Sequence, residues 1–169
     1  MTLADKSIRY FDANSGEMAV NKFAEGAKNE WYYFDQDGKA VTGLKTINNQ
    51  VLYFGQDGKQ IKGQVVTLAD KSIRYFDANS GEMAVNKFAE GAKNEWYYFD
   101  QDGKAVTGLQ TINKQVLYFG QDGKQVKGQV VTLADKSIRY FDANSGEMAV
   151  NKFAEGAKNE WYYFDQDGK

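Results

Sequence analysis

The sequence predicts an all-β fold, a β-solenoid of stacked β-hairpins, from two nested repeats. The longer repeat has a period of 65 residues: the segment Thr2–Lys6 returns at 67–71 and again at 132–136. The shorter repeat is a Tyr-Phe pair followed by a turn. A fixed period of this kind indicates an array in which each unit packs on its neighbours. We therefore expect any binding surface to recur along the chain.

The shorter repeat sets the number of hairpins in each long period. Successive tyrosines of the pairs are separated by 23, 20 and 22 residues, and the same steps then recur. The eight tyrosines are Tyr10, Tyr33, Tyr53, Tyr75, Tyr98, Tyr118, Tyr140 and Tyr163. The turns after the first three pairs span residues 12–16, 35–38 and 55–58, and each ends in glycine. Glycine accepts a positive φ without a steric clash, so each long period predicts three hairpins.

Each Tyr-Phe pair is expected to pair with the segment after its turn. The expected partners are Ile8–Phe11 with Glu17–Val20, Trp31–Phe34 with Lys39–Gly43, and Val51–Phe54 with Lys59–Gly63. The return segments alternate between apolar and polar residues, as half-buried strands do. No segment has a sustained helical period. We interpret Met18–Lys28 as strand and loop, with a short helical turn as the alternative, and Phe23–Asn29 as the source of a third strand.

The whole chain, residues 1–169, is predicted to be one repeat array, with repeats at 2–66 and 67–131 and a partial repeat at 132–169. Residues 1–104 differ from 66–169 at only four positions, namely Met1/Val66, Lys45/Gln110, Asn49/Lys114 and Ile61/Val126. This sameness favours a recent duplication or an engineered array, used as a self-associating scaffold without a ligand, as an alternative function. The eighth hairpin lacks its return segment, which predicts an unpaired edge and end-to-end association. Met1 stands where later copies have valine, so we expect a fragment with an added initiator and no signal peptide.

Composition excludes several classes of function. The chain has no histidine and no cysteine, which removes the usual general base, thiol nucleophile and metal ligands. Its net charge of −2 has mixed signs, and no apolar run is long enough to span a membrane, so neither nucleic acid nor membrane insertion is expected. Asp35 and Asp37 lie in a tight turn, without the apolar pocket that raises the pKa of a catalytic carboxyl. An EF-hand register fails at Tyr33 and Leu44. We predict a protein without catalytic activity, metal or cofactor.

Aromatic rings beside amides and lysines are the recurring chemistry. Trp31 and Tyr33 point to one face of their strand, and Tyr32 and Phe34 to the other. One face must form the core, and the other can offer a ring to solvent. A ring beside amide and ammonium donors suits a sugar, because the C–H face stacks on the ring while the hydroxyls form hydrogen bonds. The alternative is that all the rings are core and the lysines form a solvated face.

The sequence resembles the aromatic and glycine repeats of glucan-binding domains in glucansucrases. The resemblance rests on residues 31–44, 46–48 and 52–54, and on 8–19 and 122–131, and it extends over the whole chain. It implies a secreted or cell-surface parent protein, whose catalytic domain is separate, and multivalent binding of an α-glucan such as dextran. The ligand-binding residues that it implies are Tyr53, Gln60 and Lys62, with their copies Tyr118, Gln125 and Lys127. Trp31, Tyr33, Trp96 and Tyr98 are further candidates.

Choline-binding modules share the short aromatic motif and give a second alternative. They resemble Gly-Trp…Trp-Tyr-Tyr hairpins whose rings surround a quaternary ammonium by cation–π attraction. In this chain the Gly-Trp position is occupied by Gly43-Leu44 and Gly108-Leu109. One wall of the aromatic cage is therefore missing in these hairpins, which disfavours choline.

Overall fold

The structure, a computed structural model, describes all of residues 1–169 and contains fourteen β-strands and no α-helix. None of its elements is a helix long and apolar enough to cross a membrane. The chain divides into two compact units. Unit 1 comprises Met1–Leu68 and Arg74–Ala84, and unit 2 comprises Ala69–Ile73 and Val85–Lys169. The all-β prediction is confirmed, and the strand and loop interpretation of Met18–Lys28 is correct.

The strands form seven two-stranded sheets. The first six strands are β1 (Lys22–Glu25), β2 (Trp31–Phe34), β3 (Gly43–Ile47), β4 (Gln50–Phe54), β5 (Gln64–Thr67) and β6 (Ile73–Phe76). The remaining strands are β7 (Lys87–Glu90), β8 (Trp96–Phe99), β9 (Gly108–Ile112), β10 (Gln115–Phe119), β11 (Gln129–Thr132), β12 (Ile138–Phe141), β13 (Lys152–Glu155) and β14 (Trp161–Phe164). Each strand of one copy thus has its counterpart 65 residues later.

Each Tyr-Phe strand forms its ladder mainly with the segment before it, which corrects the expected pairing. β2 pairs antiparallel with β1 over four residue pairs, from Lys22↔Phe34 to Glu25↔Trp31. The segment after the turn adds one bridge, Phe34↔Ala40, and Val41 N–H donates to the Tyr33 carbonyl at 2.9 Å. Gly43, with φ of +77°, then turns the chain into β3. The third strand expected within Phe23–Asn29 is therefore present as β1, and it is the principal partner.

Two kinds of turn connect these segments. In the Asp-Gly turn, the Asp35 carboxylate accepts the backbone N–H groups of Asp37 and Lys39, both at 2.9 Å. The β3–β4 turn consists of two residues with positive φ, Asn48 at 51° and Asn49 at 65°. Two successive positive φ values define a type I′ hairpin turn, which asparagine tolerates better than most residues. This second turn was not predicted from the sequence.

The core lies between successive hairpins, because a ladder with a hairpin on either side buries both of its faces. On one face of β1–β2, the buried Phe34 packs with Ala19 and Ala24. On the other face, Tyr33 packs against the buried Leu52 and Phe54 of the next hairpin. The inward-facing phenylalanines are Phe34, Phe54, Phe76, Phe99, Phe119, Phe141 and Phe164. Phe11, at the N-terminal end, is 43% exposed, so its Tyr-Phe pair differs from the others.

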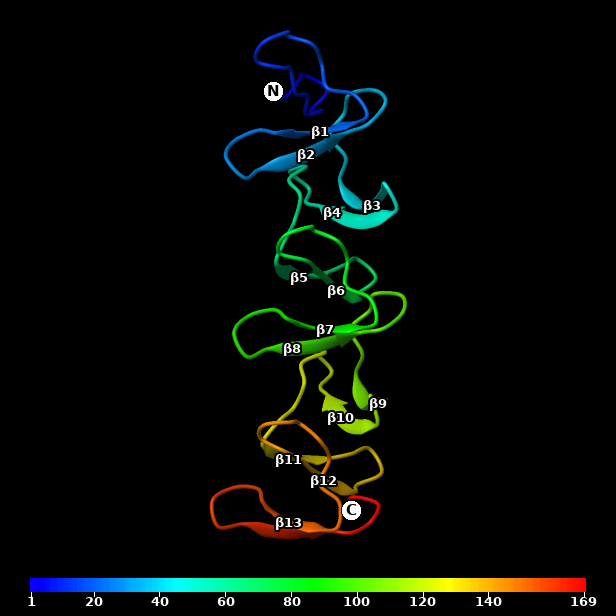
Figure 1. Cartoon of the computed structure of the whole chain (residues 1–169), viewed down its shortest axis with the longest axis vertical. Helices are drawn as coiled ribbons and strands as arrows, with labels where there is room; N and C mark the ends of the chain where they lie inside the picture. Colours follow the sequence, from blue (N-terminus) through cyan, green and yellow to red (C-terminus); the bar gives the residue numbers. More distant parts are fainter. The chain divides into compact units, whose positions relative to one another are not determined.

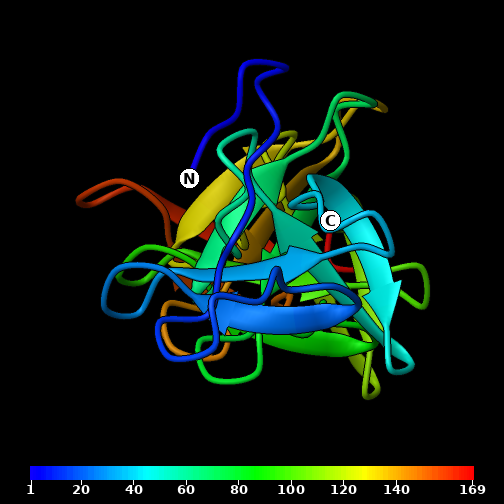
Figure 2. The ribbon, with the colours of Figure 1, turned by 90° about the horizontal axis from the view of Figure 1, so that it is seen from above.

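Within unit 1 the hairpins follow one another in chain order, β1–β2 and then β3–β4 (Figure 1). Seen from above, the β1–β2 and β3–β4 pairs run in different directions (Figure 2). Successive ladders are thus rotated as well as stacked, and each packs on its sequence neighbours. This is the arrangement of a β-solenoid of stacked hairpins, and the predicted fold class is confirmed.

Candidate functional site

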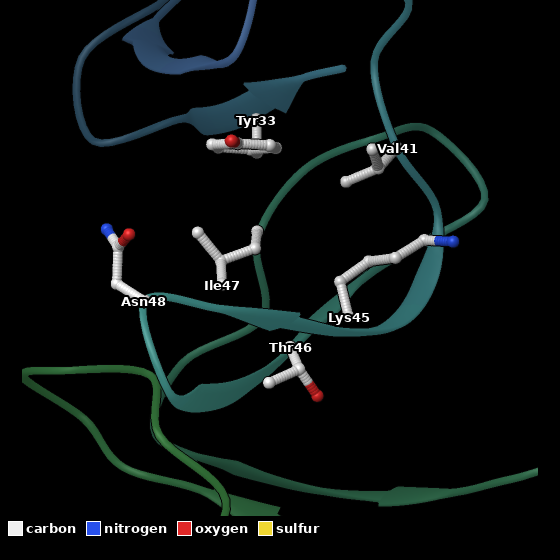
Figure 3. A pocket seen from close by; sticks show the side chains of 6 residues that line it. All are labelled: Tyr33, Val41, Lys45, Thr46, Ile47 and Asn48. Atoms are coloured by element: carbon white, nitrogen blue, oxygen red, sulfur yellow. The ribbon is translucent and has the colours of Figure 1, made fainter. Parts of the chain in front are cut away.

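The first candidate site is a hollow of about 270 Å³ in unit 1, between β2 and the β3–β4 hairpin. We call it the Tyr33 hollow, and it is lined by Tyr33, Val41, Lys45, Thr46, Ile47 and Asn48. Figure 3 shows the Tyr33 ring lying over Ile47, with the Asn48 amide on one side and Lys45 on the other. The hollow thus combines an apolar surface with an amide and an ammonium group, while the Thr46 side chain projects from the opposite side of β3.

The chain fixes the Tyr33 ring from two directions. Phe23, its partner across β1–β2, meets it edge-on with ring centroids 4.9 Å apart and planes at 67°. Val41, just after the Asp-Gly turn, packs with Tyr33 on the cluster of Ile47, Leu52 and Phe54. The half-buried ring is therefore held before any ligand arrives, which lowers the entropic cost of binding.

The second candidate site, the Tyr98 hollow, is the counterpart in unit 2 and has a volume of about 420 Å³. It is lined by Asn86, Tyr98, Asp100, Gln101, Asp102, Val106, Gln110, Thr111, Ile112 and Asn113. Tyr98 meets Phe88 edge-on at 4.9 Å and 66°, as Tyr33 meets Phe23. The Gln110 amide donates to the Thr107 carbonyl at 2.8 Å. Tyr33 and Tyr98, both predicted as ligand-binding, thus lie in equivalent hollows.

The predicted set of Tyr53, Gln60 and Lys62 is brought together against the turn at 77–81. The Tyr53 ring stacks on the buried Phe76, with centroids 5.4 Å apart and planes at 25°. The Lys62 ammonium donates to the Asn79 carbonyl at 3.1 Å, and the Gln60 amide lies directly against Gly81. These donors already contact protein, so the structure gives them a packing role. Their role in ligand binding stays a prediction.

The same contacts recur in unit 2. Tyr118 stacks on Phe141 at 5.5 Å and 29°, and Lys127 donates to the Asn144 carbonyl at 3.2 Å. Gln125 lies against Gly146 as Gln60 lies against Gly81. The two predicted sets are therefore equivalent to each other, and they are distinct from the residues that line the Tyr33 and Tyr98 hollows.

Trp31 lines a different hollow from Tyr33, although both are in β2. That hollow, of about 400 Å³, is lined by Tyr10, Asp12, Ser15, Glu17, Met18, Ala19, Lys22, Phe23, Ala24, Glu25 and Trp31. Trp96, the copy of Trp31, is half-buried in β8, and its carbonyl accepts the Gln125 N–H at 2.7 Å. Trp31 and Tyr33, which were predicted to share one face of their strand, thus contribute to separate hollows.

The polar residues of the two hollows were not predicted from the sequence. Thr46, Asn48, Thr111 and Asn113 lie in or just before the type I′ turns, and so do Lys45 and Gln110. A signal was present, because Asn48-Asn49 is a two-residue pair able to adopt positive φ. Recognising that turn would have placed the β3–β4 hairpin, and with it the far wall of the hollow.

The titratable groups of the array serve turns and packing. Backbone N–H groups of Ser15 and Asn14 hold the pKa of Asp12 below its usual value, which keeps this turn carboxylate ionised. Burial raises the pKa of Tyr97, whose ring packs in the core. No group of three or more acidic residues is placed to hold a metal ion. Each hollow presents a tyrosine ring with its hydroxyl group and an asparagine amide, and these groups suit the binding of a ligand.

Two family profiles match the chain. The choline-binding repeat matches residues 41–88 and 106–153, which together make up more than half of the chain. The cell wall binding repeat matches residues 25–40, 90–105 and 155–169. Both matches recur with the 65-residue period and follow the hairpins seen in the structure.

Curated relatives are glucosyltransferases of streptococci. Glucosyltransferase-S of Streptococcus mutans serotype c is 52% identical over 169 residues, which is 100% of this chain and 11% of that protein. Glucosyltransferase-I of Streptococcus downei is 44% identical over 155 residues, 92% of this chain and 10% of that protein. The chain spans about a tenth of the length of these relatives.

Solved structures with the same fold come from Streptococcus pneumoniae. Choline binding protein F has a TM-score of 0.73 at 23% identity, covering 98% of this chain and 55% of that one. The modular autolysin LytC has a TM-score of 0.75 at 18% identity, covering 95% and 37%. The choline-binding domain of CbpL has a TM-score of 0.60 at 26% identity, covering 98% and 93%. The chain therefore belongs to the family of choline-binding and cell wall binding repeats, as an array of the kind that streptococcal glucosyltransferases contain.

Proposed function

We propose that the chain is a non-catalytic carbohydrate-binding array that binds an α-glucan such as dextran at several sites. The observation that carries the proposal is the pair of equivalent hollows, in which a fixed tyrosine ring is flanked by an asparagine amide. The whole-chain similarity to glucosyltransferases, which act on glucose units, supports a glucan as the ligand. The predicted sets around Tyr53 and Tyr118 are part of the same proposal.

The hollows suit a sugar ring for two reasons. The apolar flank formed by Tyr33 and Ile47 can take the C–H face of a pyranose. The Asn48 amide both donates and accepts hydrogen bonds, as sugar hydroxyls do. The hollow is shallow, so a single site should be weak, and a millimolar site corresponds to only about −4 kcal/mol. Several sites on one polymer raise avidity by roughly 10²–10⁴, which explains a repeated binder.

The repeat family also includes choline binders, and the structure argues against choline here. Leu44 and Leu109, which replace the cage tryptophan, are 39% and 41% exposed. A leucine side chain has no π face for a quaternary ammonium. A neutral saccharide does not need a closed aromatic cage, so the open hollows favour a glucan.

The place of the array in a larger protein follows from its relatives. They are about ten times longer than the chain, and their names assign them a transferase activity. We infer that catalysis belongs to another part of such a protein and that the array holds polymer for it. The match to a cell wall binding repeat supports a secreted or cell-surface parent.

Affinity electrophoresis through gels that contain dextran tests the proposal. We expect the chain to be retarded, a Tyr33→Ala/Tyr98→Ala variant to be retarded much less, and added choline to have no effect. An Asn48→Gly/Asn113→Gly variant removes the amides and keeps the positive φ of the turns, so it separates loss of binding from loss of fold. A Tyr53→Ala/Tyr118→Ala variant tests the second predicted set. Unretarded wild-type protein, or release by choline, would contradict the proposal.

A dextran series with arrays of one and two repeats tests multivalency. We expect affinity to rise with the number of repeats, because the second site binds at a high effective concentration. Equal affinity for both arrays would rule multivalency out.

A further inference from the structure

The Tyr33 and Tyr98 hollows are built from the same residues except at one position. The Tyr98 hollow is lined by ten residues. Nine of them are identical to the residues that lie 65 positions earlier in the chain. The exception is Lys45, which is replaced by Gln110. It is one of only four differences between the two copies along the whole shared length. The one variable position thus carries a change of charge.

The two hollows differ in charge at this position alone. Lys45 places a cation at the Tyr33 hollow, and Gln110 places none at the Tyr98 hollow. The turn carboxylates are common to both copies. Asp35 accepts the backbone N–H groups of Asp37 and Lys39, both at 2.9 Å, and Asp100 accepts those of Asp102 and Lys104 at 2.9 and 3.0 Å.

The side chains at the variable position also lie differently. Gln110 is tied to its own hairpin by the bond to the Thr107 carbonyl. Lys45 is exposed, and Figure 3 shows its stem along the hollow and its ammonium group on the side away from Asn48. A saccharide that contacts the Tyr33 ring and Asn48 can therefore extend a substituent towards the ammonium group.

We infer that position 45/110 sets the charge preference of each site, so that the array carries two kinds of saccharide site. The Tyr33 hollow binds a saccharide with an anionic substituent, a carboxylate or a phosphate, as well as neutral glucan. The Tyr98 hollow has the same turn carboxylates but no cation at this position, so it binds neutral glucan and disfavours the anionic form. This inference rests on the proposed saccharide binding and adds a second ligand class to it.

Reciprocal exchange of the two residues tests the inference, with neutral dextran, carboxymethyl dextran and phosphorylated dextran as probes. Lys45→Gln should weaken binding of both anionic polymers about threefold to fivefold at low salt, the range of an exposed ion pair, and leave neutral dextran unchanged. Gln110→Lys should strengthen anionic binding by a similar factor. Both effects should fade at high salt, because exposed charges are screened. Each residue occurs naturally in the equivalent hairpin, so the fold accommodates either exchange.

Two control variants change the net charge equally at exposed positions outside the hollows. They are Lys28→Gln for the loss of a cation and Gln121→Lys for its gain. We expect both to leave the preference between anionic and neutral polymer as in the wild type. The inference is overturned if these controls reproduce the exchanges, or if Lys45→Gln weakens neutral and anionic binding equally. Failure of wild-type protein to bind neutral dextran would instead reject the proposed function, while an effect of position 45/110 on the anionic probes would still be measured.

Discussion

Unit 2 contains two copies of one segment, Lys87–Phe99 and Lys152–Phe164, with identical sequence and different surroundings. The local geometry is the same: Phe88 meets Tyr98 at 4.9 Å and 66°, and Phe153 meets Tyr163 at 5.0 Å and 65°. Burial differs, because Phe88 and Tyr98 are half-buried whereas Phe153 and Tyr163 are 69% and 55% exposed. The segment itself determines its ladder and ring geometry, whereas a neighbouring hairpin determines whether its aromatic face is buried in the core.

The cause of the difference is the β9–β10 hairpin. Its buried residues Ile112, Leu117 and Phe119 form the cluster on which Phe88 and Tyr98 pack. The sequence ends before any counterpart of that hairpin after Tyr163. β14 itself is paired, since it forms a ladder with β13. The exposed part of this last copy is an aromatic face and not an unpaired strand, and the predicted end-to-end association stays a prediction.

The largest expected effect comes from removing an aromatic ring from the β9–β10 hairpin, which covers the first of the two segments. Phe119→Ala deletes a fully buried ring and should lower the free energy of unfolding by about 3–5 kcal/mol. Phe153→Ala removes a ring that is 69% exposed and should change it by less than about 0.5 kcal/mol. Urea unfolding followed by circular dichroism measures both. Similar losses in the two variants would mean that the face of Phe153 is covered in solution.

A smaller effect should separate backbone strain from packing by the Gln60 side chain. Gly81 and Gly43 have φ of +76° and +77°, but only at Gly81 would an added Cβ collide with Gln60. Gly43→Ala should therefore cost about 1 kcal/mol from strain alone, and Gly81→Ala about 1–2 kcal/mol, because the flexible Gln60 side chain must also move aside. Thermal unfolding of both variants checks this. In a Gln60→Ala background the difference between the two should disappear, and its persistence would refute the packing role of Gln60.

The smallest effect concerns alkaline pH. Burial raises the pKa of Tyr97 above its usual value of 10.0, so the folded state favours the neutral phenol. The stability that this burial contributes is fully present below pH 10 and is lost as pH rises through the raised pKa. Tyr97→Phe should flatten the fall in unfolding free energy above pH 10, whereas Tyr163→Phe, at an exposed ring, should not. An unchanged alkaline slope in Tyr97→Phe would contradict the assignment.

The features that could be predicted from the sequence are those that depend on interactions between residues close together in the chain. Asp35 and Gly38 specify their turn by themselves, and the alternation in Trp31–Phe34 places Phe34 in the core, so the fold class followed. The predicted extent of the strand pairing was wrong because the return segment ends early at Gly43. That early end depends on the positive φ of Gly43. The hollows were missed because the Asn48-Asn49 turn was not recognised, and Tyr33 meets Asn48 only through the β3–β4 hairpin that this turn forms.

The most direct test of the account is whether sugar binding follows the covered tyrosines. Titration calorimetry with an isomalto-oligosaccharide gives the number of sites per chain for the wild type and for three single variants. Tyr33→Ala and Tyr98→Ala should each remove one site, because each ring lines a hollow. Tyr163→Ala should leave the number unchanged, because that ring has no hairpin over it. Loss of a site in Tyr163→Ala, or none in Tyr98→Ala, would contradict the account.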